Sequence, residues 1–290
     1  VKERTDIPAG VFNVITSEDP RVVGDQLVGD PRVDMVSFTG STAVGKHIMA
    51  RASATVKKVF LELGGKSANI LLDDADFGNA LLSALAVCFH AGQGCAIATR
   101  LLVPGSRQAE AEALLKTYFG YIQYGNPAAE DQIMGPLINK RQQERVLGYI
   151  ERGRQEGARL LLGGGRPAHL PQGYYVEPTV FVDVTNDMTI AQEEIFGPVL
   201  AVIAYENEED AIRIANDSVY GLSGAVWSAD EARALRVARR IRTGTINVNG
   251  GNFYAADAPF GGYKQSGLGR EMGPEGFEEY LETKTIAIGV

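Results

Sequence analysis

Cysteine and histidine are scarce in this sequence of 290 residues. The two cysteines, Cys88 and Cys95, do not form a C-x-x-C pair, which argues against a disulfide framework and favours a reducing compartment. The three histidines, His47, His90 and His169, are scattered along the chain. Because no group of histidine, cysteine and acidic residues has the spacing of metal ligands, we expect no metal site.

Long apolar runs and clusters of positive charge are also lacking. No apolar stretch approaches the roughly 20 residues that cross a bilayer, and the first residues, VKERTDIPAG, lack the apolar core of a signal peptide. The net charge is -8, and lysine and arginine are spread along the chain, which argues against a nucleic-acid or membrane partner. We therefore expect an acidic small-molecule enzyme of the cytoplasm or of an organelle matrix.

Apolar residues make up 45% of the chain, enough for a buried core, and short β-rich runs alternate with helical patterns. In the first third we expect strands at 35–38, 58–63 and 68–73, and helices at 41–53 and 76–90. This alternation predicts an α/β fold with a parallel sheet.

A second alternating series follows the GQGC loop. Its expected strands are 100–104, 158–162, 174–183, 197–205, 224–228 and 283–290, and its expected helices are 107–122, 139–157, 207–217 and 229–242. Since no flexible linker or internal repeat interrupts the series, any domain boundary is expected inside a compact structure.

The segment VSFTGSTAVGKH joins a strand to a helix through Gly40 and Ser41. The free N–H groups of such a turn bind phosphate well. The spacing of Gly40, Gly45 and Lys46 nearly matches a P-loop, but His47 stands where magnesium coordination needs serine or threonine, which argues against a phosphotransferase. A capped helix without any ligand would explain the turn equally well.

Glu62 lies inside an apolar strand and precedes Gly64 and Gly65 in LELGGK. A buried carboxylate is energetically expensive, and the glycines would let a ligand approach the backbone, so we expect a functional role. The alternative is an ion pair with Lys66 at the end of the strand.

Cys95 ends the glycine-rich loop AGQGC, where N–H donors would stabilise a thiolate and make it a nucleophile. The alternative is a small buried residue in a turn. Cys88 lies in an apolar helix and is predicted to be a core residue.

Five segments taken in order are similar to the aldehyde dehydrogenase superfamily: FTGSTAVG, LELGGKSANILLDDAD, GQGCAIATR, EEIFGPV and PFGGYKQSGLGRE. The resemblance runs from near residue 11 almost to Val290. It implies an aldehyde dehydrogenase-like α/β fold, with 1–63 as the C-terminal part of a Rossmann-type cofactor domain and 64–266 as the catalytic domain. Residues 267–290 would return to the cofactor domain and end in an oligomerisation strand.

The resemblance also implies a reaction, namely oxidation of an aldehyde to a carboxylic acid with hydride transfer to NAD(P)+ through a thiohemiacetal and a thioester. Cys95 matches the nucleophile of the family and Glu62 the base that activates water. Glu271, in GRE, matches an acid associated with proton relay. Relatives that release the acyl group to coenzyme A typically lack a glutamate at the position of Glu62, so a free acid is the expected product.

Six further positions match residues that contact the cofactor in the family: Gly40, Ser41, Leu63, Gly64, Glu194 and Phe196. Gly40 and Ser41 match the pyrophosphate site, Glu194 the acid that holds the nicotinamide ribose, and Phe196 the ring beside the nicotinamide. From the residues alone, EEIFGPV would instead be a helix end with Glu194 solvated and Phe196 in the core, and PFGGYKQSGLG a surface loop.

The family's oxyanion-stabilising asparagine and its adenosine-ribose residues belong to segments upstream of Val1. NAD is therefore only the default over NADP, and the 290 residues alone are not expected to form a competent enzyme. A homo-oligomer, dimer or tetramer, is expected, with 283–290 adding to a neighbour's sheet. Phe253 and Tyr254 would either line a tunnel for an apolar or aromatic aldehyde or pack on the surface.

Two other functions are alternatives to this interpretation. A non-catalytic structural subunit would keep the fold, but such relatives usually lose the nucleophile or the base, and both are present. A cofactor-free acyltransferase or hydrolase would need a histidine base beside Cys95, and His90 is poorly placed on the preceding helix.

Overall fold

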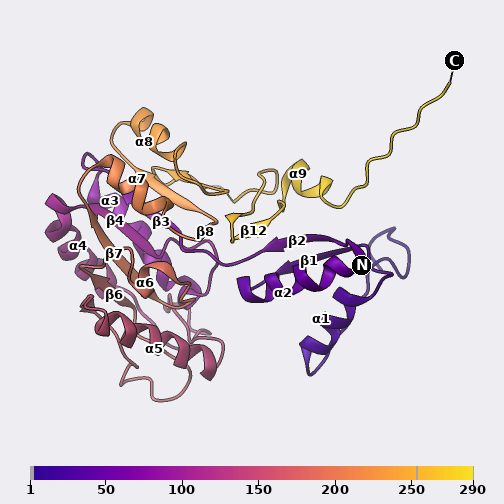
Figure 1. The fold of residues 1–290 in the computed structure, drawn as a ribbon. Coiled ribbons are helices and arrows are strands. Elements are labelled where there is room, and N and C mark those ends of the chain that lie inside the picture. The colour runs from indigo at the N-terminus through magenta and orange to yellow at the C-terminus, as the bar shows by residue number, and fades with distance from the viewer. Residues whose placement is uncertain (1–2, 253, 290) are drawn as a thin grey trace.

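The computed structural model describes residues 3–252 and 254–289, which form a larger and a smaller lobe (Figure 1). Across the larger sheet the strands are β10 (Asn247–Val248), β9 (Gly224–Trp227), β3 (Ala68–Leu71), β4 (Arg100–Pro104), β7 (Val199–Tyr205), β6 (Thr179–Val182) and β5 (Arg159–Leu162). Neighbours pair in parallel except β5 and β6, so the predicted α/β class with a parallel sheet is confirmed.

The smaller lobe contains a second sheet, with β1 (Met35–Thr39), β2 (Lys58–Glu62) and β12 (Gly267–Leu268) in that order. β1 and β2 are parallel, whereas β12 returns from the C-terminal end of the chain and pairs antiparallel with β2. The short strands β8 (Tyr220–Gly221) and β11 (Tyr263–Lys264) form an antiparallel pair.

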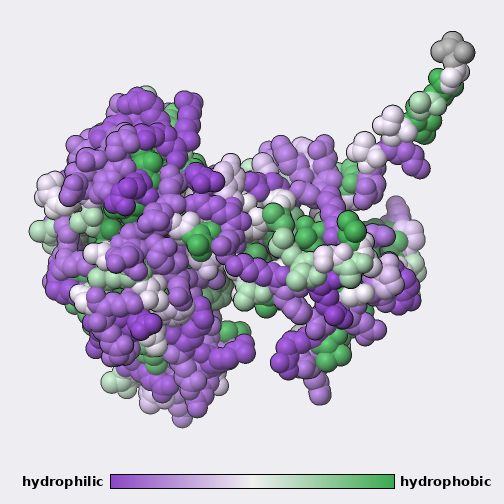
Figure 2. Space-filling view, viewed as in Figure 1, coloured by the Kyte–Doolittle hydropathy of each residue, from purple (hydrophilic) through white to green (hydrophobic). Residues whose placement is uncertain are grey.

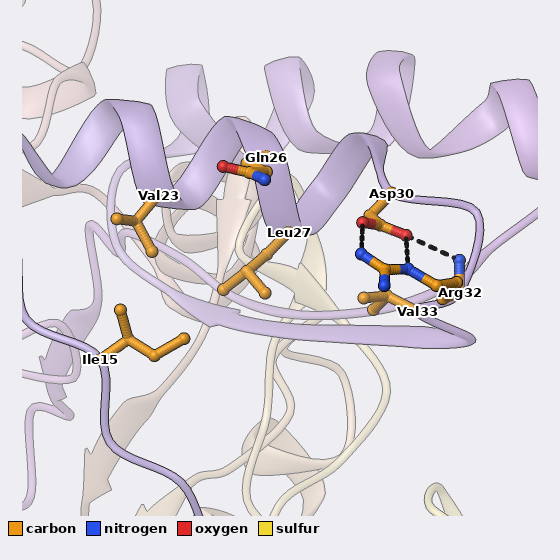
Figure 3. Close-up of a pocket in the computed structure, with 7 residues that line it drawn as sticks. All are labelled: Ile15, Val23, Gln26, Leu27, Asp30, Arg32 and Val33. Atoms are coloured by element: carbon orange, nitrogen blue, oxygen red, sulfur yellow. Dashed lines mark hydrogen bonds and ion pairs between the residues drawn. The ribbon is translucent and has the colours of Figure 1, made fainter.

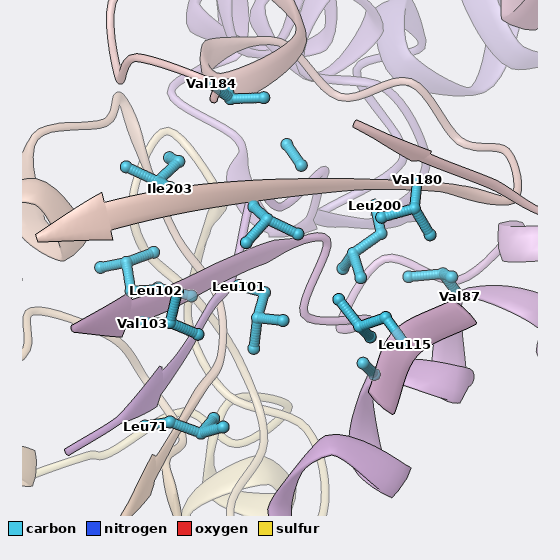
Figure 4. Packing of buried hydrophobic residues seen from close by; sticks show 14 of the residues in the cluster. Leu71, Val87, Leu101, Leu102, Val103, Leu115, Val180, Val184, Leu200 and Ile203 are labelled. Carbon is cyan, nitrogen blue, oxygen red and sulfur yellow. The ribbon is translucent and has the colours of Figure 1, made fainter. Parts of the chain in front are cut away.

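The main apolar core surrounds the central strands of the larger sheet (Figure 4). Every residue of β3, β4 and β6 is buried, and so are all residues of β7 except one. Strands that are apolar on both faces need cover on both faces. Leu71, Leu101, Leu102, Val180 and Leu200 are inaccessible to solvent or nearly so, as this arrangement requires.

Helix boundaries follow local capping. The longer helices are α1 (Pro20–Gly29), α2 (Thr42–Ala52), α4 (Gln108–Gly120), α5 (Lys140–Gln155), α7 (Glu208–Asn216) and α8 (Glu231–Ala238). Ser41 accepts from the Val44 N–H at the start of α2, and Asn139 accepts from the Gln142 N–H at the start of α5. Such side chains satisfy N–H groups that the first helical turn leaves unpaired. No described helix is long and apolar enough to span a membrane.

The predicted helix at 76–90 is present only in altered form. A short α-helix, α3 (Phe77–Ala80), continues into a 3₁₀ run, Leu81–Gly92, that is kinked near its end. The φ angles of His90, Ala91 and Gly92 are positive. The apolar repeat correctly indicated a helical segment, but it carries no information on the strained turn that leads to Cys95.

The structure differs from the prediction at two strands, one of which is shorter than predicted and one of which is absent from the described residues. It also contains short helices that were not predicted. Of 174–183, only Thr179–Val182 is a strand. The predicted strand at 283–290 is not a strand within the described chain: 283–289 extend away from the smaller lobe, where no neighbouring strand supplies hydrogen bonds (Figure 1). The helices α6 (Thr189–Gln192) and α9 (Gly273–Glu278) were not predicted.

Exposed apolar side chains are concentrated on the smaller lobe and the tail. Figure 2 shows green surface on both, and Val22, Ile286 and Ile288 are 62%, 77% and 87% exposed. Contiguous apolar surface of this kind is typical of regions that another polypeptide covers.

Arg100 joins three parts of the larger lobe through its buried guanidinium. It donates to the carbonyl oxygens of Lys66, Ile214 and Ala215 at 2.9 Å and to Asn186 Oδ1 at 3.0 Å. Burial lowers the pKa of Arg100 to about 10.

We predict that Arg100→Leu lowers the free energy of unfolding by at least about 3 kcal/mol, because several buried acceptors lose their donor. Urea unfolding measures this loss, and Arg239→Leu, at an exposed arginine, is the control. Equal effects of the two substitutions would contradict the prediction.

Candidate active site

Glu62 lies at the end of β2 with its carboxyl group buried and unpaired. The residue is 2% exposed, and among the described residues neither carboxyl oxygen has a hydrogen-bond partner. Burial, followed by the nearby Glu271 carboxylate, raises the pKa of Glu62 to about 8, while Arg270 opposes the shift. The alternative of an ion pair with Lys66 is therefore wrong. Lys66 is itself buried, which lowers its pKa to about 7.

Cys95 is half-buried and lines a cavity of about 640 Å³, which we call the Cys95 cavity. Burial, then the charge of Glu62, raises the pKa of the Cys95 thiol to about 11, although the N–H groups of Ala96 and of Cys95 itself lower it. The expected N–H donors are thus present, and burial opposes their effect on the pKa of the thiol. Cys88 is fully buried, as predicted for a core residue.

Glycines let the backbone segments around Cys95 approach one another. A Cβ on Gly65 would lie 2.5 Å from the Cys95 carbonyl oxygen. A Cβ on Gly92, which has a φ of +71°, would lie 2.0 Å from the Gly197 carbonyl oxygen. Neither position can hold a larger residue without a backbone shift, so the loop before Cys95 is fixed against two other segments.

Glu194 faces the backbone that follows Glu62. Its Oε1 accepts from the Gly65 N–H at 3.1 Å, and a Cβ on Gly64 would lie 2.4 Å from its Oε2. Burial raises the pKa of Glu194. Phe196 is 36% exposed with a φ of +59°, so the interpretation with Glu194 solvated and Phe196 in the core is wrong.

The turn at Gly40 and Ser41 lies beside the end of β2. Gly40 donates its N–H to the Glu62 carbonyl oxygen at 3.0 Å, and Ser41 caps α2. Leu63 is buried and donates its N–H to the Ser266 carbonyl oxygen at 2.8 Å. The predicted phosphate-binding turn, at the carboxyl end of β1, therefore lies beside Glu62, at the carboxyl end of β2. Ligand sites of open parallel sheets usually lie at this edge.

Glu271 is the last of the predicted site residues, and His90 is the histidine that was expected to be poorly placed as a base for Cys95. The backbone of Glu271 pairs with that of Phe260, and its carboxylate interacts electrostatically with Glu62. His90 lines the Cys95 cavity. Its carbonyl oxygen accepts hydrogen bonds from the backbone N–H and the side-chain amide of Gln93. This arrangement gives no support to a histidine-activated cysteine hydrolase. The described residues include no group that could hold a metal ion.

A second pocket, of about 390 Å³, lies beside α1 in the smaller lobe (Figure 3). Ile15 and Leu27 contribute apolar surface to it. Its charged residues, Asp30 and Arg32, are paired at 2.6 Å, and the hydrogen bond from Arg32 holds the pKa of Asp30 well below its usual range. Because this pair leaves no reactive group in the pocket, the Cys95 cavity is the better candidate for chemistry.

A family model described as the aldehyde dehydrogenase family matches residues 1–286. The chain belongs to the aldehyde dehydrogenase family. Among curated aldehyde dehydrogenases, the 3-succinoylsemialdehyde-pyridine dehydrogenase of a Pseudomonas species is 48% identical over 288 residues, which cover 98% of this chain and 60% of that protein. The chain thus spans about three-fifths of the length of the curated relatives it matches.

Solved aldehyde dehydrogenase structures confirm the expected fold. A cysteine-to-alanine variant of aldehyde dehydrogenase C from Pseudomonas syringae, in complex with NAD+ and octanal, has a TM-score of 0.89 and 48% identity, covering 90% of this chain and 54% of that one. A Mycobacterium tuberculosis aldehyde dehydrogenase in complex with NAD+ has a TM-score of 0.86 and 50% identity, covering 88% and 53%.

The raised pKa of Glu62 predicts a pH-dependent contribution to stability. The folded pKa of about 8 exceeds the ordinary value of 4.5, so the contribution is complete below about pH 4.5 and is lost as the pH rises to about 8. We expect the difference in unfolding free energy between the unaltered protein and Glu62→Gln to change across this window and to be constant above it. Urea unfolding at several pH values measures the difference. Glu282→Gln, in the exposed tail, is the control, and a pH-independent difference for Glu62→Gln would contradict the prediction.

Proposed function

We propose that an enzyme of full family length containing this chain oxidises an aldehyde to a carboxylic acid and passes the hydride to NAD+. The observation that carries the proposal is the Cys95 thiol, which lines a cavity of about 640 Å³ and interacts electrostatically with Glu62, a buried carboxyl group with no hydrogen-bond partner among the described residues. A nucleophile and a base that act on the same carbon need this proximity.

The described residues fit a nicotinamide dinucleotide. The N-terminus of α2, which begins after Ser41, would offer the N–H groups of its first turn to a pyrophosphate, whereas the Gly40 N–H is already donated to the Glu62 carbonyl oxygen. Gly64 lets the Glu194 carboxylate approach the backbone, where this carboxylate would suit ribose hydroxyls, and Phe196 offers an exposed ring next to it. NAD+ in both aldehyde dehydrogenase structures compared above favours NAD+ as the cofactor. When bound, the nicotinamide accepts the hydride that leaves the substrate carbon.

Cys95 begins the reaction by forming a bond between its sulfur and the carbonyl carbon. The thiol proton passes to Glu62, whose charge acts on the thiol, and then onward to Glu271, so that Glu62 is free to act again as a base; the carbonyl oxygen becomes the alkoxide of a thiohemiacetal. The Cys95 and Ala96 N–H groups lie beside the sulfur and can donate to developing negative charge. Loss of hydride from the carbon then leaves a thioester on Cys95.

Glu62 is proposed to complete the cycle by taking a proton from water. The hydroxide attacks the thioester carbon, the C–S bond breaks, and the products are a carboxylic acid and the free thiol. With a pKa of about 8, Glu62 is a stronger base than an ordinary carboxylate, which suits this step near neutral pH. Glu271 would accept the proton onward, since the two carboxyl groups interact.

The lining of the Cys95 cavity favours an uncharged, apolar aldehyde. No Asp, Glu, Lys or Arg occurs among the described residues that line it, and large apolar or aromatic side chains do: Leu82, Phe89, Ile97, Trp227, Tyr254 and Phe260. Asn69 accepts from Trp227 Nε1 at 3.0 Å and donates to Ser83 Oγ at 2.8 Å, so these polar groups already satisfy one another. The bound octanal of the Pseudomonas syringae relative agrees with this substrate class. Phe253 lies outside the described residues.

Domain division and oligomeric state are also part of the proposal. The boundaries 1–63, 64–266 and 267–290 are supported by the pairing of β12 with β2, which returns the chain to the smaller lobe. A homo-oligomer in which 283–290 pairs with a neighbour is supported by the exposed Ile286 and Ile288.

We expect Cys95→Ala to abolish NAD+ reduction in the full-length enzyme while NAD+ binding is retained. Cys88→Ala should keep turnover and lose only about 1 kcal/mol of stability through packing. Absorbance of the reduced nicotinamide measures turnover, and mass spectrometry detects the acyl group on the protein. Near-normal turnover by Cys95→Ala would refute the nucleophile assignment.

We further expect kcat/KM to rise by about fourfold for each methylene from propanal to hexanal, because each added group leaves water for an apolar wall. Succinic semialdehyde, which has the chain length of butanal and a carboxylate, should be at least about tenfold poorer than butanal because its charge would be buried without a partner. Steady-state kinetics with saturating NAD+ tests both expectations. Equal kcat/KM for the two four-carbon aldehydes would exclude an apolar substrate class.

A further inference from the structure

Helix α5 holds the backbone of the segment that carries Glu194 and Phe196. Gln142 Nε2 donates to the carbonyl oxygens of Ile195 and Phe196 at 3.2 and 2.8 Å. Arg145 Nη2 donates to the Glu194 carbonyl oxygen at 2.7 Å. Two side chains, three residues apart on one helix face, thus hold three consecutive peptide carbonyls.

The segment needs such support because Phe196 adopts a left-handed conformation, with a φ of +59°. A non-glycine residue in this region is strained and persists only when surrounding contacts fix it. Gln142 supplies this restraint at the strained residue itself, through the Phe196 carbonyl oxygen.

A second contact from α5 separates two adjacent acids. Tyr149 donates its hydroxyl to Glu193 Oε2 at 2.6 Å and accepts from Arg145 at 3.1 Å, and the Arg145 guanidinium lies 4.9 Å from the Tyr149 ring centre. Glu193 is therefore held on the α5 side, while Glu194 turns to the Gly65 N–H.

We propose that Gln142, Arg145 and Tyr149 form a positioning element that selects Glu194, and not Glu193, as the acid that faces the glycine backbone. The inference rests on the proposed function, since Glu194 is there assigned to the cofactor ribose. Tyr149 acts through Glu193 and therefore touches neither of the reacting groups. Without the Tyr149 hydroxyl, the 193–196 segment gains alternative conformations. Cofactor binding must then order the segment, which weakens the affinity.

Tyr149→Phe in the full-length enzyme is the main test, because it removes one hydroxyl and keeps the ring that packs against Arg145. We expect the Kd for NAD+, measured by calorimetry, to rise by about tenfold, as for loss of a hydrogen bond to a charged group. The value of kcat at saturating NAD+ and aldehyde should stay within about twofold. Amide hydrogen exchange in the peptide covering 193–198 should become faster in the cofactor-free protein.

Two further variants sharpen the test. Tyr118→Phe is the matched control, because it removes a tyrosine hydroxyl that donates to the Gly78 carbonyl oxygen at 2.8 Å, away from the site; it should change neither Kd nor exchange. Gln142→Met keeps the length of the side chain and removes its amide. It should weaken NAD+ binding and speed exchange in the same peptide as Tyr149→Phe does.

Unchanged exchange and unchanged Kd in both Tyr149→Phe and Gln142→Met would overturn the proposal. Faster exchange with unchanged Kd would overturn the assignment to the cofactor. Glu194→Gln then identifies the source of that failure. If this variant also leaves the Kd for NAD+ unchanged, Glu194 does not hold the cofactor, and that part of the proposed function fails. If it raises the Kd, only the positioning role fails. The thiol chemistry is tested separately by Cys95→Ala.

Discussion

The Glu62 carboxyl group, which is buried and has no hydrogen-bond partner within residues 3–252 and 254–289, is the constraint on which the candidate site depends. An unpaired carboxylate in an apolar setting is strongly destabilising, so the group keeps its proton to a higher pH instead. The neighbouring Glu271 acts in the same direction. The end of β2 can tolerate this residue because the raised pKa keeps the group neutral over much of the physiological pH range.

The same region brings together segments that are distant in sequence, and glycine permits each approach. Gly65 passes against the Cys95 carbonyl and Gly92 against Gly197, with no space for a side chain at either. The segments that carry the base, the thiol and Glu194 consequently behave as one packed unit. A shift in any one of them would move the others, and the role proposed above for the α5 side chains depends on this coupling.

The sequence was sufficient for much of the fold because the strands of the larger sheet are apolar on both faces and helices such as α2 have capping residues. Ser41 marks a helix start that the structure contains. The apolar repeat before Cys95 could not distinguish an α-helix from a 3₁₀ run, since residues three apart, such as Leu81, Ala84 and Val87, lie on one face in both. The sequence also could not show that Glu62 has no ion-pair partner among the described residues. Lys66 stands only four positions away, and whether two such side chains point toward each other depends on the tertiary structure. Gln142 and Arg145 gave no signal, since they look like ordinary polar residues of an amphipathic helix.

The two pKa values at the site have a joint consequence for the order of events. Burial and the charge of Glu62 raise the pKa of Cys95 to about 11, and burial and the charge of Glu271 raise the pKa of Glu62 to about 8, so both groups are mainly protonated at pH 7. The thiol is then a weak nucleophile and is protected from adventitious reaction. A positive charge placed among Cys95, Glu62 and Glu194 would lower the pKa of all three groups at once. An oxidised nicotinamide ring carries such a charge and a reduced one does not. In the proposed enzyme, the thiol would therefore become reactive when the oxidised cofactor enters, and Glu62 would regain its affinity for a proton once the hydride has been transferred.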